Sequence, residues 1–600
     1  MFVCKACSKR GFSTTALGGA RAGARALQHP RHASLAVGAA SRRAAPPASD
    51  AQAGPPAQAD EEVDPIAKRR AEKLEWVVKK HLQYLKDPLK IAEHVKATLD
   101  KDKFDEALLL TRNASRDAPV TVSWNHLIDY QMKHQRLHGA IKLYNEMKKR
   151  AQFPDARTYT IIFRGCAASV HPKLAVSEAM RIYMGMASSQ RIQPSIIHLN
   201  AVLEVCNRAG DLESMFTMLK NVNDRTRTPD SQTFTIVLNA LRHDIGSTQL
   251  GLGDREGLGD KAKDQLRDGA LMKAKMIWED VSTRWKDGRL VIDENLVCAM
   301  GRILVAGDSS DKWSVGSLLE ETMRIPRFDA SSGLLGGGES QQGLGSTEVA
   351  KADGRYAKAG NNALSMAMEY LLATKKTSVA PKYWHHFTSV LGVRPDKDNY
   401  IKYLRVIQKG RSSAKAAEVL RTVPTEILAP YVYRMAMSTC IHDELNPNAF
   451  KNACTIYDVM IKLSRYPDPL CMRLFLQSAR GSVRHIYEKH DKDSEAAKLA
   501  VGQQIVAALD RMWQPFRILM SSFSYPTEQT RSQSPGQLWK LGEDVRSEAM
   551  ATARRMIAAM DVVVGEAMAG PEEVKVLKGR RIVLNKLVER YTKSLDSDAS

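Results

Sequence analysis

The stretch TVSWNHLIDYQMKHQRLHGAIKLYNEMKKRAQFPD, residues 121–155, decides the fold. Its apolar residues form two helical stripes: Val122, Trp124, Leu127 and Ile128 in the first, and Leu137, Ile141, Leu143, Tyr144 and Met147 in the second. A polar turn at 134–136 separates the stripes, and Pro154-Asp155 ends the second. The pattern predicts a hairpin of two short helices, each with one apolar face, whose core contains Leu127, Ile128, Ile141 and Tyr144.

A second copy of this pattern follows at residues 196–230, IIHLNAVLEVCNRAGDLESMFTMLKNVNDRTRTPD. The two stretches have the same length and align without gaps, so that Asn125 matches Asn200 and both units close with Pro-Asp. A single hairpin cannot bury two apolar faces by itself, and successive units must therefore stack into a solenoid. The fold class expected is all-α.

Weaker units surround the two clear ones. Residues 156–195 fit one unit lengthened by about five residues near 169–174, and 103–110 resemble the second helix of a preceding unit. Residues 231–293 look like a unit split by a Gly-rich insert at 246–259. Further units are expected to start near Arg394-Pro395-Asp396, to span 430–468, and to open at 469–479.

Composition shifts suggest the following organisation: a presequence at 1–49, a disordered linker at 50–64, an N-terminal array at 65–330, a flexible Gly-rich insertion at 331–358, a degenerate C-terminal array at 359–521, and a basic C-terminal extension at 522–600. Within the extension, helices are expected around 548–569 and 572–593.

The charge points to a polyanionic partner. The chain has 88 Lys and Arg against 67 Asp and Glu, a formal net charge of +21. Eight of the cations lie in the first 49 residues, which hold no acid, and the remaining 80 still outnumber the acids by 13. A basic body of this kind is suited to binding nucleic acid.

The first 49 residues are rich in Ala, Arg and Ser, as mitochondrial presequences are, which predicts import into the matrix. A basic tail that contacts nucleic acid directly is the alternative. No apolar run is long enough to suggest a membrane span. Of the eight cysteines, only Cys4 and Cys7 form a C-x-x-C pair, with no second pair beside it, so unpaired thiols and no metal are expected.

With two 35-residue helical hairpins, Asn at the fifth position and a closing Pro-Asp, the chain resembles pentatricopeptide-repeat proteins. The Trp-Leu-Gly-Tyr pattern of tetratricopeptide repeats is absent. The resemblance implies a right-handed superhelical solenoid of helical hairpins that binds single-stranded RNA. The order of presequence, array, Gly-rich break and degenerate array is most similar to the fungal family that matures mitochondrial small-subunit ribosomal RNA, whose members are also described as group I intron splicing factors.

In this family, the resemblance implies, the fifth and last residues of each repeat contact the base edge and the second packs on the base face. The RNA-binding residues carried over are Val122, Asn125 and Asp155 in the first clear unit, Arg157, Thr160 and Ser195 in the second, Ile197, Asn200 and Asp230 in the third, and Gln232 and Thr235 in the fourth. Asn with Asp implies a pyrimidine, and Thr at the fifth place a purine, although Thr160 with Ser195 departs from the usual combinations.

Some of these residues also have structural interpretations. Asp155 and Asp230 stand directly before helices and are suited to capping them, a role compatible with base contact. Asn125 and Asn200 lie within helical stripes, which favours RNA contact. Trp124 and Tyr159 are expected in the core. Cations on second helices are candidates for holding phosphates: Lys142, Lys148, Lys149 and Arg150.

No catalytic motif was found: the sequence lacks GxxxxGK[ST], HExxH, GxSxG and the HxE…PCxxC pair of deaminases. No enzyme activity, cofactor or metal is expected. The function predicted is RNA binding in mitochondria that supports ribosomal RNA 5′-end maturation or splicing, with a ribosomal RNA precursor or intron-containing transcript and the mitochondrial small ribosomal subunit as partners. Two alternatives remain: a permanent subunit of that ribosome, and a protein-binding scaffold or translation activator.

Overall fold

The computed structural model describes residues 65–189, 191–220, 228–250, 259–328, 355–464, 466–490, 494–521 and 543–598. The presequence and linker expected at 1–64 lie outside the described residues, as does most of the Gly-rich insertion expected at 331–358. Residues 1–70 and Ala71–Ser600 form two units, and the first is described only where helix α1 begins.

The described residues contain helices and no strand, as the all-α prediction requires. Up to residue 328 the helices are α1 (Pro65–Tyr84), α2 (Pro88–Leu99), α3 (Phe104–Ala114), α4 (Thr121–Lys133), α5 (Leu137–Lys149), α6 (Ala156–Ala167), α7 (Pro172–Ala187), α8 (Ile196–Ala209), α9 (Leu212–Lys220), α10 (Ser231–Leu250), α11 (Asp260–Lys286), α12 (Glu294–Ala306) and α13 (Ser309–Met323). After residue 354 they are α14 (Asn361–Ala373), η4 (Thr377–Val379), α15 (Ala380–His385), η5 (His386–Val390), α16 (Lys397–Lys409), α17 (Ser413–Thr422), η6 (Thr425–Ile427), α18 (Pro430–His442), α19 (Ala449–Leu463), α20 (Pro469–Gly481), α21 (Arg484–Tyr487), α22 (Glu495–Ser521), α24 (Glu543–Gly565) and α25 (Pro571–Asp598).

Helices α4 and α5 form the hairpin that the sequence predicts, and they pack against each other. The four predicted core residues are all buried: Leu127, Ile128, Ile141 and Tyr144. Trp124 and Tyr159 are buried too, and the Trp124 indole N–H donates to Ser115 Oγ at 2.9 Å. A buried indole needs such a partner, since an unpaired N–H in the core costs free energy.

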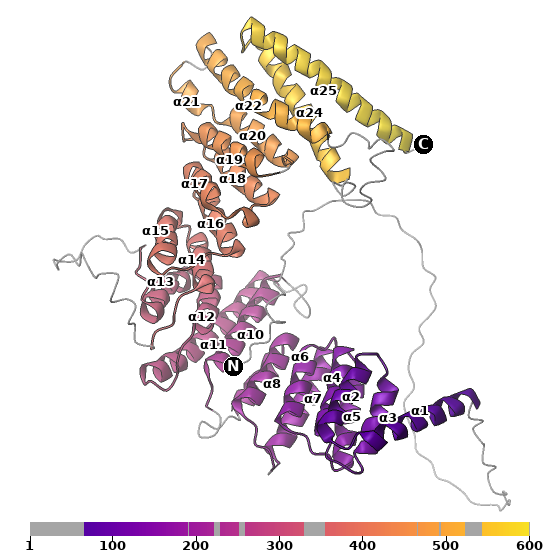
Figure 1. Cartoon of the computed structure of the whole chain (residues 1–600). Coiled ribbons are helices and arrows are strands. Elements are labelled where there is room, and N and C mark those ends of the chain that lie inside the picture. Colours follow the sequence, from indigo (N-terminus) through magenta and orange to yellow (C-terminus); the bar gives the residue numbers. More distant parts are fainter. Residues whose placement is uncertain are drawn as a thin grey trace, which may run out of the picture. The chain divides into compact units, whose positions relative to one another are not determined.

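The hairpins stack through their first helices. Contacts run from each first helix to the next, along α2, α4, α6, α8, α10, α12, α14, α16, α18 and α20, which we call the first-helix row (Figure 1). Second helices contact the first helix of their own unit, as α5 does with α4, and some also pack on the next unit, as α7 does on α8. Because every unit buries its apolar faces against neighbouring units, the array is a helical-repeat solenoid.

Several helices lie where the weaker units predict them. Helix α3 covers all but the first residue of the expected 103–110 segment, α16 follows Asp396, α18 and α19 lie within 430–468, and α20 begins at Pro469. Helices α24 and α25 are the two expected in the C-terminal extension. On either side of residues 329–354 the chain is joined by hydrogen bonds: Ala357 N–H donates to Thr322 O at 3.0 Å, and Trp285 Nε1 donates to Arg355 O at 2.8 Å.

Two details of the predicted units were wrong. Helix α7 has 16 residues where α5 has 13, so much of the extra length of 156–195 lies in its second helix and not at 169–174. The Gly-rich insert does not begin at Gly246, because α10 continues through this residue to Leu250. A single glycine lowers helix stability by only about 1 kcal/mol, which the buried residues Leu238, Leu241 and Ile245 of α10 offset.

In the units of α4 and α8, the turn between the two helices contains a left-handed residue. Gly210 takes this conformation with φ 70° after α8, and Gln135 does so with φ 60° at the same place after α4. Glycine adopts a positive φ without steric cost, so this turn is less strained in the unit of α8 than in that of α4.

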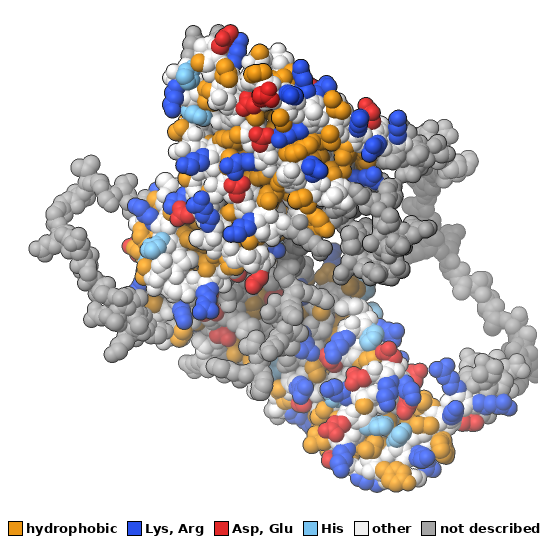
Figure 2. Space-filling model, turned by 45° about the horizontal axis from the view of Figure 1, so that its top comes forward, with side chains coloured by type: hydrophobic (Ala, Val, Ile, Leu, Met, Phe, Trp, Pro, Cys, Tyr) orange, Lys and Arg blue, Asp and Glu red, His pale blue; other side chains and the backbone are white. Residues whose placement is uncertain are grey.

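The molecular surface mixes charges of both signs. Figure 2 shows Lys and Arg side chains scattered among Asp, Glu and apolar groups over the visible face. Among the described helices, none combines the length and apolar character that crossing a membrane requires.

Candidate nucleic-acid interface

A hollow of about 540 Å³ opens on the first-helix row, where α2, α4 and α6 lie next to one another. Four of the residues expected to contact RNA line it: Val122, Asn125, Arg157 and Thr160. They come from two successive units, with Val122 and Asn125 on α4, and Arg157 and Thr160 on α6. We call this hollow the N-terminal groove.

Some charged side chains of the N-terminal groove form ion pairs, and others do not. Arg164 and Lys133 both bind Asp129, at 3.0 and 2.8 Å, so the single carboxylate offsets only part of their positive charge. Lys96 and Arg157 are exposed and form no ion pair with any described residue. The groove therefore offers two unpaired positive charges beside polar groups, which suits a phosphodiester backbone.

The charges of the N-terminal groove shift the pKa of His126. Burial lowers the pKa of its imidazole, and the positive charges of Lys96 and Arg157 lower this pKa further, while Asp129 opposes them. These effects hold the pKa of the imidazole below its ordinary value of 6.5, which favours the neutral form.

Asn125 is tied into a hydrogen-bonded triad with Asp155 and Thr158. Asn125 Nδ2 donates to Asp155 Oδ1 at 3.2 Å, and Thr158 Oγ1 lies 2.7 Å from Asn125 Oδ1. Asp155 Oδ1 also accepts from the Thr158 backbone N–H at 2.7 Å, which caps α6. The triad joins α4 to the start of α6, and Asn125 is only 2% exposed.

The same triad recurs 75 residues later, on α8 and α10. Asn200 Nδ2 donates to Asp230 Oδ1 at 3.1 Å, Thr233 Oγ1 lies 2.7 Å from Asn200 Oδ1, and Asp230 Oδ1 accepts from the Thr233 N–H at 2.8 Å. Both Asp residues thus cap a helix, one of the two roles that the sequence left open for them. In neither Asp does the second oxygen, Oδ2, bond to any described residue.

The unit between them, 156–195, is built differently. Thr160 Oγ1 donates to Ala156 O of its own helix at 2.9 Å, and no bond joins it to Ser195 among the described residues. Ser195 instead pairs with His198, whose Nδ1 lies 2.8 Å from Ser195 Oγ. The unusual combination of Thr160 with Ser195 therefore corresponds to hydrogen bonds that differ from those of the Asn-Asp-Thr triads.

The remaining predicted contacts differ in accessibility. Ile197, at the second place of its unit, is 64% exposed, and Gln232 is exposed as well. Thr235 is half-buried and donates to Ser231 O at 2.7 Å. An exposed isoleucine on a helix of the first-helix row provides an apolar surface on which the face of a base can pack.

The cations predicted on second helices do not line the N-terminal groove. Lys148 stacks on the Tyr144 ring at 4.4 Å, and Arg150 binds Glu146 at 3.0 Å. Sequence reasoning missed Lys96, His126 and Tyr130, which do line the groove, because it is formed by helices from three different units. Thr158 and Thr233 were missed too, although each stands three residues after the closing Asp in an Asp-x-x-Thr pattern.

A second hollow, of about 430 Å³, lies farther along the same row, on α10, α12 and α14. It is lined by Arg242 and Arg302 together with Glu369. Burial lowers the pKa of Arg242, and the neighbouring positive charge of Arg302 adds to this. Arg302 Nε lies 3.5 Å from Glu369 Oε2, and Lys402 binds the other oxygen of the same carboxylate, so the two cations share one negative charge.

The described cysteines are free thiols, as expected: Cys166, Cys206, Cys298, Cys440, Cys454 and Cys471. Burial raises the pKa of Cys166 and Cys298 to about 12, which leaves them protonated and unreactive. Cys4 and Cys7 lie outside the described residues.

Comparison with known proteins identifies the repeat. The model of the PPR repeat family matches residues 119–168, and that of the pentatricopeptide repeat domain matches residues 185–242. Pentatricopeptide repeat-containing protein 2, mitochondrial, of Schizosaccharomyces pombe is 22% identical over 56% of this chain and 72% of its own length. Pentatricopeptide repeat-containing protein 1, mitochondrial, of Rattus norvegicus is 27% identical over 24% of this chain and 21% of its own length.

Among solved structures, the pentatricopeptide repeat protein PPR10 from maize is 12% identical, covering 90% of this chain and 88% of its own, with a TM-score of 0.27. A structure of PPR10 with an 18-nucleotide RNA element gives a TM-score of 0.28. Two matching repeat models, stacked helical hairpins and mitochondrial relatives with the same repeat agree with one another. The chain therefore contains pentatricopeptide repeats within residues 119–168 and 185–242 and is similar to pentatricopeptide-repeat proteins.

Proposed function

We propose that this chain binds single-stranded RNA in mitochondria, along its first-helix row, and supports 5′-end maturation of small-subunit ribosomal RNA or splicing of intron-containing transcripts without catalysing a step itself. The observation that carries the proposal is the convergence of Val122, Asn125, Arg157 and Thr160 on one groove with unpaired cations. The mitochondrial location is supported by the names of the relatives.

The polar groups of the N-terminal groove are suited to reading a base edge. The Asn125 amide has a second Nδ2 hydrogen beyond the one given to Asp155, and its Oδ1 has a second lone pair. The Thr158 hydroxyl has one proton, so it cannot donate to Asn125 and Asp155 at the same time. The triad fixes the plane of the amide, and a fixed donor and acceptor discriminate between bases better than a mobile pair.

The family pattern makes the test specific. Asn at the fifth place with a closing Asp implies a pyrimidine, and Thr implies a purine. The double variant Asn125→Thr/Asn200→Thr should therefore shift the preference from pyrimidine to purine at two nucleotides of the bound sequence. Binding of randomised RNA followed by sequencing measures this shift directly. Since Thr160 occupies this place naturally, threonine is compatible with the helix.

The matched control lies outside the groove: Lys149→Ala on α5 should leave the preferred sequence unchanged. Thermal unfolding of each variant must be followed, because Asn125 and Asn200 also join neighbouring helices. An unchanged base preference in a folded double variant would mean that the repeats do not read RNA through these positions.

The RNA target requires a separate experiment. Crosslinking in isolated mitochondria, followed by sequencing of the bound RNA, should recover small-subunit ribosomal RNA precursors or intron-containing transcripts. Sedimentation in high salt then separates two roles, because a maturation factor is found on precursor particles whereas a permanent subunit stays on the mature small subunit. Recovery of no RNA at all would favour the protein-binding scaffold.

A further inference from the structure

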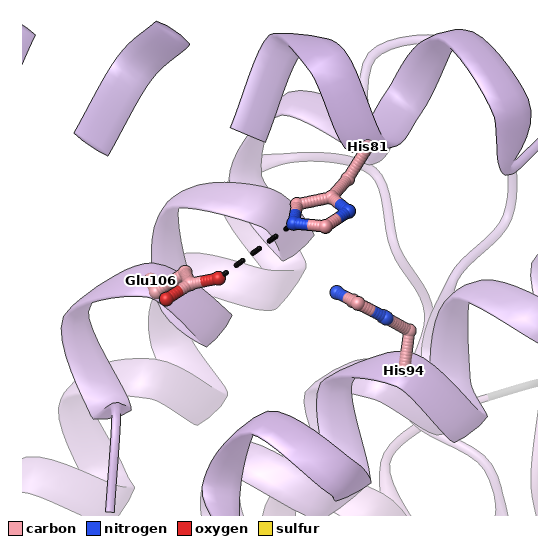
Figure 3. Close-up of side chains that lie close together, drawn as sticks. All are labelled: His81, His94 and Glu106. Atoms are coloured by element: carbon pink, nitrogen blue, oxygen red, sulfur yellow. Dashed lines mark ion pairs between the residues drawn. The ribbon is translucent and has the colours of Figure 1, made fainter. Parts of the chain in front are cut away.

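Three side chains from three consecutive helices meet at the start of the array. His81 is on α1, His94 on α2 and Glu106 on α3, and one ligand atom of each lies within 4.8 Å of the others. Figure 3 shows the imidazole of His81 directed at the carboxylate of Glu106, with the His94 ring turned into the same space. His81 Nε2 lies 4.0 Å from Glu106 Oε1, and the two imidazole centroids are 4.5 Å apart.

The ligand atoms of this cluster are available. His94 Nε2 is buried and has no hydrogen-bond partner among the described residues. The side chain of Glu106 is only 14% exposed, and its other oxygen, Oε2, lies 3.6 Å from Lys103 Nζ. One carboxylate oxygen thus faces the histidines while the other faces a lysine, an arrangement that allows single-oxygen ligation. A buried polar nitrogen without a partner is unfavourable and needs an explanation.

We propose that His81, His94 and Glu106 bind a divalent transition metal ion, with zinc as the best match. Two imidazole nitrogens and one carboxylate oxygen form a ligand set that zinc accepts readily, whereas calcium and magnesium prefer oxygen alone. Tetrahedral zinc with bonds of about 2.1 Å holds its ligands roughly 3.4 Å apart. The 4.0 Å separation between His81 and Glu106 is close to this value, and small side-chain rotations bring the ligands together.

The ion would fasten α1 to the array. Along the described part of α1, Val78 is the one residue that is buried, so apolar packing holds this helix weakly. A metal that joins α1 to α2 and α3 replaces missing packing by coordination, and binding energy of this kind adds to folding stability. Three protein ligands leave a fourth position for water.

The test uses the full chain without a histidine tag and with Cys4→Ser and Cys7→Ser, so that the thiols at the N-terminus do not compete. Zinc affinity is measured by competition with a chromophoric chelator, and cobalt absorption reports the coordination. We expect one equivalent of zinc, and affinity at least about 10-fold weaker in His81→Ala, His94→Ala and Glu106→Gln, since even outer partners of a metal site change affinity by this much. Zinc should also slow hydrogen exchange of the amides of residues 71–84.

The control is His138→Ala, which removes an exposed histidine on α5 and should leave zinc affinity unchanged. Circular dichroism without metal shows whether each variant folds. If a histidine variant does not fold, Glu106→Gln still tests the site, because glutamine keeps the shape of the side chain. Absence of zinc binding, or equal affinity in the parent and in the folded cluster variants, would overturn the proposal.

Discussion

The same junction between neighbouring units is built in two ways, in the repeat at 121–155 and in the repeat at 430–468. In the first, the fifth residue is Asn125, and it donates to the closing Asp155 at 3.2 Å. In the second, the fifth residue is Arg434, and its guanidinium binds both oxygens of the closing Asp468, with Nε 2.7 Å from Oδ2. Both Asp residues cap the following helix, at Thr158 N and Cys471 N respectively.

The comparison separates a structural element from a variable one. The closing Asp caps a helix in both units, so this role does not depend on RNA. The fifth residue decides what remains for a ligand: Asn125 leaves Asp155 Oδ2 without a partner among the described residues, whereas Arg434 occupies both oxygens of Asp468. We infer that the N-terminal repeats are the ones suited to base reading and that the later repeat is locked by its ion pair.

The largest effect is expected from Arg434→Ala. This change leaves Asp468, whose side chain is 9% exposed, without its cation. We expect the free energy of unfolding to fall by about 3 kcal/mol, the lower part of the range for breaking a buried pair, because Arg434 itself is 40% exposed. Chemical denaturation measures the loss.

Arg434→Asn gives this unit the residue of the N-terminal one and should recover part of the stability. The selectivity of RNA binding should stay unchanged in Arg434→Ala. A changed base preference in that variant would contradict the inference that the N-terminal repeats contact bases and that the repeat at 430–468 does not.

The next effect concerns how closely first helices approach. A Cβ on Gly165 of α6 would lie 2.5 Å from Met132 Cγ and 2.7 Å from Met132 Cβ on α4, which is the fixed end of that side chain. We expect Gly165→Ala to destabilise the chain by about 2 kcal/mol, as overpacking in a core does. A Cβ on Gly301 of α12 would meet the mobile sulfur end of Met366, so Gly301→Ala should cost less.

Gly185→Ala serves as the control, since nothing lies within 4 Å of the added carbon. It should raise the melting temperature slightly, because alanine favours a helix by up to about 1 kcal/mol over glycine. Equal losses of stability in Gly165→Ala and Gly301→Ala would contradict this difference, because Met132 and Met366 would then adjust equally well to the added Cβ.

The fold was predictable because its signal is local and repeated. The two apolar stripes of 121–155 and their copy at 196–230 determine hairpins, and hairpins with two apolar faces must stack. The extra length of α7 was misplaced because a helix can be extended by three residues without any change in its periodicity. Gly246 was read as the start of an insert, but burial of its neighbours in α10 outweighs its low helix propensity.

The candidate sites were less predictable because their residues come from different units. Asn125 and Thr158 are 33 positions apart, so helical periodicity does not predict that they are bonded. His81, His94 and Glu106 show none of the short spacings typical of metal motifs, and they meet only because three helices pack together. The repeated Asp-x-x-Thr pattern was the one local signal that could have revealed the triads.

A smaller effect separates the charges of the N-terminal groove from those of the second helices. Replacing Lys96 and Arg157 by Ala should weaken binding of all RNA sequences alike and reduce the slope of log affinity against log salt by about 1 for each lost phosphate contact. Lys149→Ala on α5 should leave the slope unchanged. Filter binding at several salt concentrations measures the slope. A smaller slope in Lys149→Ala than in the Lys96 and Arg157 variants would place the RNA backbone along the second helices.

The smallest effect is a pH dependence of RNA binding through His126. Burial, Lys96, Arg157 and Lys133 keep the pKa of this imidazole below 6.5 in the free chain, while Asp129 acts in the opposite direction. Phosphates in the groove would offset the cations and favour the imidazolium, so the pKa of His126 should be higher in the complex than in the free chain. The complex then holds more protons, and affinity should rise as the pH falls through the pKa of His126 in the complex.

The free chain should respond in the opposite direction. Because the pKa of His126 is lowered in the folded state, the unfolded chain takes up the proton first, and stability is lost as the pH falls below 6.5. Affinities are therefore compared only where circular dichroism shows a folded chain. His126→Gln should remove the rise in affinity, whereas His138→Gln on the exposed side of α5 should keep it. If the rise persists in His126→Gln, its source is another group, and the RNA backbone does not pass close to this imidazole.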